Sequence, residues 1–148
     1  MEKECRTLED LYQEAARFVS TLIPHENAAT LITLSGALGA GKTAFTKAVA
    51  RSLGVEERVT SPTFVLEKIY DLPAPRNGTG FARLVHIDAY RLEGATALSP
   101  LGFDALMRDP QNLILIEWPE QVVGGLPEPA TRISFVARND ESRTVTYA

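Results

Sequence analysis

The sequence predicts a single α/β domain over residues 1–148, in which helices flank a central, mostly parallel sheet with antiparallel strands at its edges. Three observations lead to this fold class. Short apolar segments recur along the chain, and stretches of helical periodicity lie between several of them. Residues 113–118 form an apolar run typical of a strand that is covered on both faces. A length of 148 residues suffices for one domain with a core and is too short for two ordinary ones.

The elements are expected in a definite order along the chain. Thr7 and Asp10 have the spacing of a capping box, and apolar residues then recur at helical spacing up to Pro24, so the first element is a helix. Residues 73–80 are rich in proline and glycine, which predicts a long hairpin turn. The further predicted strands are residues 30–35, 64–71, 81–88, 113–118, 131–136 and 143–147, and the further predicted helices are residues 42–53 and 98–107. The last two strands are expected to pair as an antiparallel hairpin.

The composition excludes several classes of protein. A formal net charge of -4 gives no overall attraction to nucleic acid or to anionic lipid, so any connection with RNA is expected to run through a partner or a local patch. The single cysteine, Cys5, cannot form a disulfide framework or a thiolate metal cluster within the chain. No apolar run approaches the roughly 20 residues that a membrane span needs. We therefore expect a cytoplasmic protein that does not enter a membrane.

Residues 36–43, Gly-Ala-Leu-Gly-Ala-Gly-Lys-Thr, match the pattern G-x-x-x-x-G-K-[ST] between a predicted strand and a predicted helix. This is the context in which the pattern forms a P-loop, and it indicates a P-loop NTPase-like domain that binds ATP and Mg²⁺. Gly36 and Gly41 can adopt backbone angles closed to other residues, so amide N–H groups can surround a phosphate. Lys42 would reach the β and γ phosphates, and the Thr43 hydroxyl would be a magnesium ligand. The expected nucleotide-binding residues here are Leu38, Gly39, Ala40, Gly41, Lys42, Thr43 and Ala44.

Two carboxylates are expected at strand ends, where open α/β sheets bind their ligands. Asp88 and Glu117 each follow a short apolar segment. Either one could hold the magnesium ion through water, with Thr43, while the other polarises the attacking water, so Lys42, Asp88 and Glu117 are the candidate catalytic residues. The simpler interpretations are that Asp88 is a turn residue and that Glu117 lies where its strand reaches solvent.

Four further residues have both a structural and a functional interpretation. Ser61 and Thr63 lie in Thr-Ser-Pro-Thr, which is either a nucleotide-sensing loop near the γ phosphate or an ordinary turn before a strand. His86 is expected to be a packed histidine rather than a catalytic base. Trp118 is expected to pack in the core or at its rim.

Taken in order, these segments resemble the TsaE (YjeE) family of bacterial ATPases. The residues that carry the resemblance are Leu-Gly-Ala-Gly-Lys-Thr at 38–43, Ser-Pro-Thr-Phe at 61–64, His-Ile-Asp-Ala-Tyr-Arg-Leu at 86–92 and Ile-Glu-Trp-Pro at 116–119. The resemblance implies an ATPase that acts in making N6-threonylcarbamoyladenosine in tRNA and resets a complex of TsaB and TsaD type proteins. It implies only an indirect connection with tRNA. Ala37 and Ala44 depart from the family pattern, which usually has an acidic residue and a hydroxyl at these positions.

Two other functions are compatible with the P-loop. A small-molecule kinase would share the P-loop and the magnesium site, but it needs an acceptor pocket and usually an arginine in a lid. Arg91 and Arg108 are candidates for such an arginine, although neither lies in a lid-like segment. The other alternative is a nucleotide-dependent binding module with negligible hydrolysis.

Overall fold

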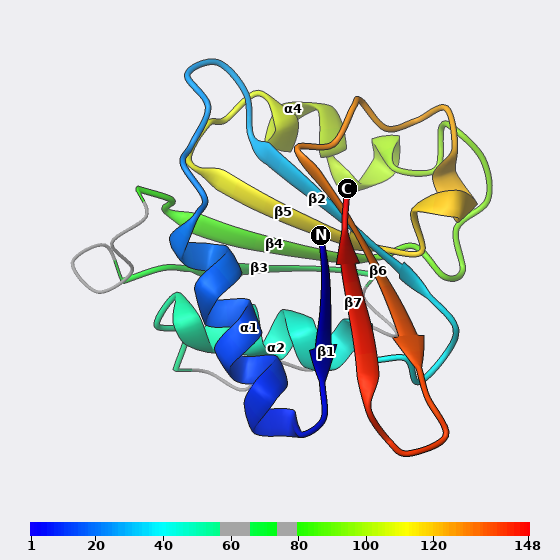
Figure 1. The fold of residues 1–148 in the computed structure, drawn as a ribbon. Helices are drawn as coiled ribbons and strands as arrows, with labels where there is room; N and C mark the ends of the chain where they lie inside the picture. The colour runs from blue at the N-terminus through cyan, green and yellow to red at the C-terminus, as the bar shows by residue number, and fades with distance from the viewer. Residues whose placement is uncertain (57–65, 74–79) are drawn as a thin grey trace.

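The computed structural model describes residues 1–56, 66–73 and 80–148, and a seven-stranded sheet runs through this described part of the chain (Figure 1). The strands lie in the order β1-β7-β6-β2-β5-β4-β3. Their bounds are β1 (Glu2–Cys5), β2 (Thr30–Gly36), β3 (Glu67–Asp71), β4 (Arg83–Asp88), β5 (Asn112–Glu117), β6 (Thr131–Ala137) and β7 (Arg143–Tyr147). The helices are α1 (Leu8–Ser20), α2 (Lys42–Ser52) and α4 (Phe103–Met107), with the short 3₁₀ helices η1 (Ser99–Leu101) and η2 (Pro119–Val122).

Four parallel strands, β6, β2, β5 and β4, form the centre of the sheet. The pairs β1-β7, β6-β7 and β3-β4 are antiparallel and lie toward its two edges. This arrangement confirms the predicted α/β fold with a parallel core and antiparallel edges. Every residue of β5 is buried, which explains why its sequence is a continuous apolar run and does not alternate.

Helices cover both faces of the sheet, as Figure 1 shows. On one face, α1 and α2 pack against the sheet, and Phe45 of α2 lies between Phe18 of α1 and Phe135 of β6, with ring centroids 6.1 and 5.4 Å away. On the other face, α4, η1 and η2 cover a second apolar cluster around Ile87 and Ile116. The two clusters are therefore separated by the central strands, whose side chains point alternately to either face.

The first helix begins where its capping box predicts. Thr7 Oγ1 accepts a hydrogen bond from Asp10 N at 3.0 Å, and the Asp10 carboxylate accepts one from Thr7 N at 3.2 Å. The helix ends at Ser20, four residues before Pro24. Its buried residues include Leu11, Ala15, Phe18 and Val19, which recur at helical spacing and form the face turned toward the sheet.

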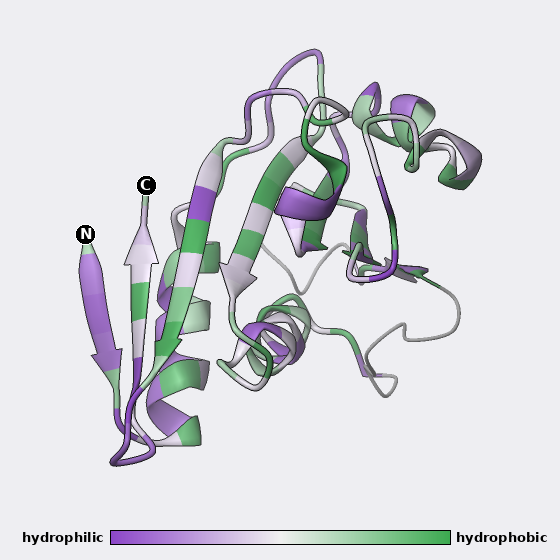
Figure 2. Cartoon of the chain, turned by 90° about the vertical axis from the view of Figure 1, so that its right-hand side faces the viewer, coloured by the Kyte–Doolittle hydropathy of each residue, from purple (hydrophilic) through white to green (hydrophobic). Residues whose placement is uncertain are grey.

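Several predicted elements differ in detail from the structure. The helix expected at residues 98–107 is two short helices, because Gly102 takes a left-handed φ of 73° between η1 and α4. The strand β1 was not predicted, and Figure 2 shows that it is almost entirely hydrophilic. The predicted strand at residues 64–71 begins at Glu67, and its first two residues, like residues 74–79 of the expected hairpin turn, lie outside the described residues.

The parallel strands β2, β4 and β5 all point toward one end of the sheet. Leu34 of β2 and Asp88 of β4 both pair with Glu117 of β5, so the carboxyl ends of these strands lie side by side. This is the end at which a parallel sheet presents its ligand-binding loops. Among the described helices, none has the length and apolar character needed to cross a membrane.

Candidate functional site

The loop after β2 follows a path that only glycine can take at two positions. Gly36 has a φ of 145°, and a Cβ atom there would lie 2.6 Å from the carbonyl oxygen of Phe135. Gly41 has a φ of 115° and precedes the first residue of α2, so the helix begins with its N–H groups facing the loop. This backbone therefore has the shape and the partial positive charge of an anion-binding loop.

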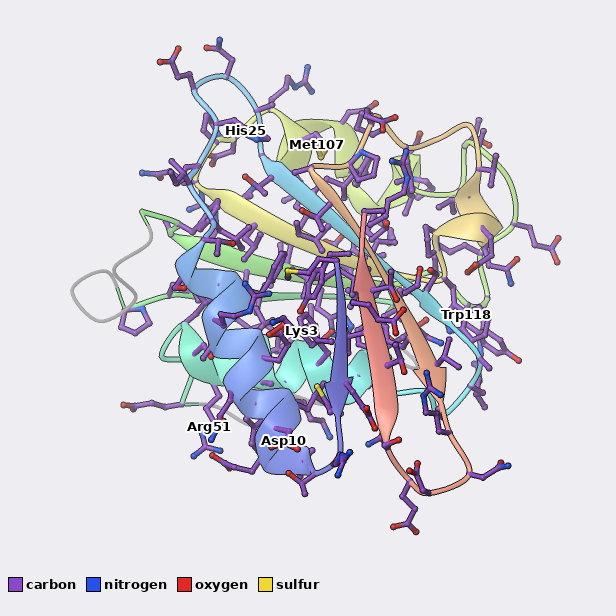
Figure 3. The ribbon with its side chains drawn as sticks, in the orientation of Figure 1. Lys3, Asp10, His25, Arg51, Met107 and Trp118 are labelled. Atoms are coloured by element: carbon purple, nitrogen blue, oxygen red, sulfur yellow. The ribbon has the colours of Figure 1, made fainter. Side chains whose placement is uncertain are left out.

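A cavity of about 490 Å³ opens beside this loop at the carboxyl ends of the strands. Its lining residues are Leu38, Gly39, Gly41, Lys42, Thr43, Ala44, Leu66, Asp88, Tyr90, Arg91, Glu117, Trp118 and Arg143. Figure 3 shows Trp118 at the right of the molecule, away from His25 at the upper left. The cavity therefore lies where the parallel sheet predicts a ligand.

Lys42 is buried and interacts with neutral groups around the cavity. Its Nζ donates hydrogen bonds to the carbonyl oxygens of Gly36 and of Ala37, the latter at 3.1 Å. The ammonium nitrogen also lies 3.9 Å from the ring centroid of Trp118. Burial lowers the pKa of Lys42, while the negative charges of Glu117, Glu120 and Asp88 oppose this shift. A bound phosphate would therefore give this buried cation the counter-charge that its direct hydrogen-bond partners do not provide.

Thr43, Glu117 and His86 form a chain of hydrogen bonds beside Lys42. The Thr43 hydroxyl donates to the two carboxylate oxygens of Glu117, at 3.2 and 3.3 Å. On its other side, Glu117 Oε2 lies 2.5 Å from His86 Nε2. Only 2% of Glu117 is exposed, so its strand does not simply reach solvent there. Sequence reasoning missed the contact with His86, which depends on the pairing of two strands that are distant in sequence.

Asp88 ends β4 and also lines the cavity. Its Oδ1 accepts a hydrogen bond from Tyr90 N at 3.0 Å, so Asp88 is a turn residue as the simpler interpretation predicted. It is also the direct cross-strand neighbour of Glu117. The structure thus brings Asp88, Glu117, Lys42 and Thr43 to one cavity.

The donor atoms present fit a magnesium ion bound together with a nucleotide. The Thr43 hydroxyl and the carboxylates of Glu117 and Asp88 are oxygen donors, which Mg²⁺ prefers. Within the described ranges, no three His, Cys, Asp or Glu side chains gather into a self-contained metal site. A magnesium ion here would therefore take its remaining ligands from phosphate and water, as is usual for this ion.

Most of the other residues expected to contact nucleotide also lie at the cavity. Leu38, Gly39, Gly41 and Ala44 line it, whereas Ala40 is buried and packs in the core. Ser61 and Thr63, the two expected hydroxyl groups of the sensing loop, lie outside the described residues.

Arg143 is a cavity residue that sequence reasoning missed. It is the first residue of β7, and its side chain lies against Gly41, where an added Cβ atom would be 2.8 Å from Arg143 Cδ. In the described part of the chain, Arg143 Nε is buried without a hydrogen-bond partner. No local pattern indicates this contact, because Arg143 is about one hundred residues from the P-loop. Only the sheet topology brings them together.

Two residues at the cavity have backbone angles that side chains other than glycine rarely adopt. Leu66 has a φ of 66° and Trp118 a φ of 61°. Trp118 was expected within a strand, but β5 ends at Glu117, and this turn carries the indole ring over Lys42. Such angles cost energy and persist where the surrounding structure enforces them, often at functional sites.

This fold and cavity define a P-loop NTPase-like protein, in which the strand β2 leads through a G-x-x-x-x-G-K-T loop into α2 beside two acidic strand ends. A family model described as "Threonylcarbamoyl adenosine biosynthesis protein TsaE" matches residues 7–145. The chain therefore belongs to the TsaE family, which confirms the resemblance found in the sequence.

Individual relatives agree with this assignment. A protein of Treponema pallidum named tRNA threonylcarbamoyladenosine biosynthesis protein TsaE is 34% identical over 136 residues, which cover 92% of this chain and 94% of the relative. A protein of the same name from Streptomyces coelicolor is 42% identical over 107 residues, covering 72% and 68%. The crystal structure of YdiB from Bacillus subtilis has a TM-score of 0.73 and 28% identity, and the match covers 99% of this chain and 83% of YdiB.

Proposed function

We propose that this chain is a Mg²⁺-dependent ATPase in the biosynthesis of N6-threonylcarbamoyladenosine in tRNA, where ATP binding and hydrolysis reset a complex of TsaB and TsaD type proteins. The observation that carries the proposal is the meeting of Lys42, Thr43 and Glu117 at one cavity beside the glycine-rich loop. The names of the relatives support the pathway.

The binding step follows from the groups that face the cavity. Backbone N–H groups at the start of α2 and the Lys42 ammonium would hold the phosphates, since both favour negative charge. Bound magnesium would offset the charge of the β and γ phosphates. The Thr43 hydroxyl would be a ligand of the magnesium ion. Glu117, which contacts Thr43, would lie on the same side of the site as this ion.

The hydrolysis step needs a group that orients the attacking water. We assign this role to Asp88, because Asp88 lines the cavity and Glu117 contacts Thr43, the other expected metal ligand. The sequence alone did not decide which carboxylate holds the metal and which orients the water. This assignment gives the metal to Glu117 and the water to Asp88. Turnover by the isolated chain would be slow, with the partner proteins completing the site.

The proposal is tested by an ATPase assay with and without TsaB and TsaD type proteins and tRNA. We expect slow hydrolysis by the chain alone and faster hydrolysis with the partners. Glu117→Ala should retain metal-free nucleotide binding and lose hydrolysis, and Glu128→Ala, an exposed carboxylate outside the cavity lining, serves as the control. Fast turnover alone, or transfer of phosphate to an added metabolite, would favour a kinase. Absence of turnover under all conditions would favour a nucleotide-dependent binding module.

A further inference from the structure

His86 contacts the proposed metal-side carboxylate from inside the sheet. It lies on β4 opposite Leu115 of β5, and Glu117 is two residues further along β5, so both side chains point to the same face. His86 is completely buried, and its Nε2 is 2.5 Å from Glu117 Oε2. It lines no part of the cavity, and so it acts on a ligand only through Glu117.

The hydrogen-bond partners of the two ring nitrogens indicate which nitrogen of His86 carries the proton. Among the described residues, Nδ1 is buried without a partner. A buried N–H without an acceptor is more costly than a buried lone pair without a donor. The arrangement with the lower cost therefore places the proton on Nε2, from which it is donated to the Glu117 carboxylate, and leaves Nδ1 as the unpaired acceptor.

The imidazole does more than fill space. An apolar side chain of similar size would leave no unpaired nitrogen, but it would also remove the group that pairs with the buried Glu117 carboxylate. What the imidazole provides is a fixed hydrogen bond to a nearly buried carboxylate. Residues that orient a metal ligand in this way set its direction and its basicity.

We propose that His86 is a positioning residue that holds Glu117 in the orientation required for magnesium–nucleotide binding. The proposal rests on the assignment of Glu117 to the metal side of the site. Among the residues that the structure describes, Glu117 has two side-chain hydrogen-bond partners, Thr43 and His86. Thr43 would itself be a metal ligand, whereas His86 would not contact the metal. The contact of His86 with Glu117 is therefore independent of the metal.

The test compares two substitutions of His86 with a control. His86→Gln retains an N–H donor near the position of Nε2, whereas His86→Leu fills the space without a donor. Thr30→Val is the control, because Thr30 is also buried and its hydroxyl has no partner in the described chain, yet it begins β2 at the far end from the cavity. Binding of Mn²⁺ in the presence of ADP is measured from the spin-resonance signal of free Mn²⁺, and metal-free ADP binding is measured by calorimetry with EDTA.

We expect His86→Leu to bind Mn²⁺ with ADP at least about tenfold more weakly than the original chain, which is the usual effect of removing such a supporting group. Metal-free ADP binding should be unchanged. His86→Gln should restore most of the Mn²⁺ affinity, and Thr30→Val should retain all of it.

Three results would overturn the proposal. Unchanged Mn²⁺ affinity in His86→Leu would show that Glu117 needs no such support. Equal losses in His86→Leu and His86→Gln would show that the donor is not the important feature. Loss of metal-free ADP binding in His86→Leu, together with a lower melting temperature than that of Thr30→Val, would show a structural role. These measurements concern binding, so they test the role of His86 even if the chain hydrolyses no ATP. Absence of hydrolysis would contradict the proposed function and not the role of His86.

Discussion

Lys42 is a buried cation whose direct hydrogen-bond partners in the described part of the chain are two carbonyl oxygens, with an indole face beside them. Burial removes water from around the charged form and destabilises it, which lowers the pKa of Lys42. A triphosphate would relieve this cost with charge-assisted hydrogen bonds. The affinity for nucleotide is therefore expected to depend on this one side chain more than on any other group in the cavity.

Lys42→Ala is expected to abolish measurable ATP binding, because it removes the cation directed at the phosphates. Calorimetric titration with Mg–ATP checks this. Lys47→Ala is the matched control, since Lys47 lies on the same helix and is exposed, and it should bind ATP as the original chain does. Tight ATP binding by Lys42→Ala would remove the basis of the site assignment.

Arg143 should contribute to nucleotide binding from the other wall of the cavity. Its buried Nε, which has no partner among the described residues, lies beside Gly41. Ala44, also in the lining, lacks the hydroxyl that many P-loops direct at the α phosphate. A hydrogen bond from a charged group contributes about 1.5–3 kcal/mol, so Arg143→Ala should weaken ATP binding roughly 10- to 100-fold.

The control for Arg143 is Arg132→Ala. Arg132 is half exposed and forms an ion pair with Glu128 at 2.8 Å on β6, away from the cavity lining. It should not change the dissociation constant for ATP measured by calorimetry. If both arginine variants bind ATP equally well, Arg143 is a packing residue and not a nucleotide contact.

At the scale of elements, the edge strand β3 contains a carboxylate in an unfavourable environment. Glu67 opens the strand, and its Oε2 is buried without a partner in the described chain. Burial raises the pKa of this carboxyl group above its ordinary value of 4.5. The folded chain therefore holds the proton more tightly than the unfolded chain does, and the resulting stability is lost as the pH rises through the folded-state pKa.

Glu67→Gln should accordingly stabilise the protein at pH 7, because it removes a charge that the fold disfavours. The difference from the original chain should shrink as the pH falls and disappear below 4.5, where the carboxyl group is protonated in both states. Urea denaturation at several pH values measures both effects. Asp71→Asn, an exposed position on the same strand, is the control and should show no such trend. A constant difference across the pH range would contradict the prediction.

The elements that sequence patterns predicted are those whose signal is local. The P-loop is a motif with fixed positions, α1 has a capping box and a helical apolar stripe, and β5 is continuously apolar. In contrast, β1 has only one buried residue, Cys5, and it is a strand because β7 pairs with it from the other end of the chain. Gly102 divides residues 98–107, which were expected to form one helix, into two short helices. Apolar periodicity alone does not reveal this break.

At the scale of the whole molecule, the cavity joins groups from the loop after β2 and from α2, β4, β5 and β7. A ligand that binds only the folded chain stabilises it by RT ln(1 + [L]/Kd), or about 2.7 kcal/mol at one hundred times the dissociation constant. Mg–ATP should therefore raise the melting temperature of the original chain and leave that of Lys42→Ala unchanged. Thermal unfolding with and without Mg–ATP measures this, and equal shifts in the two proteins would indicate binding elsewhere.

The candidate site was predictable to the extent that its residues belong to motifs. Lys42, Thr43, Asp88 and Glu117 were proposed from the P-loop and from strand ends, and the structure brings them to one cavity. The contacts of His86 and Arg143 depend instead on which strands are neighbours in the sheet. Strand neighbours are a property of the complete fold, so residue spacing along one chain does not reveal these two contacts.

The pairing of β1 with β7 has a consequence for the order in which the protein is made. Residues 2–5 leave the ribosome about 140 residues before their hydrogen-bonding partners at 143–146, and these two segments lie side by side in Figure 1. Arg143 arrives with that later segment. The P-loop of a nascent chain is thus synthesised long before Arg143, the residue that packs against Gly41 in the folded protein.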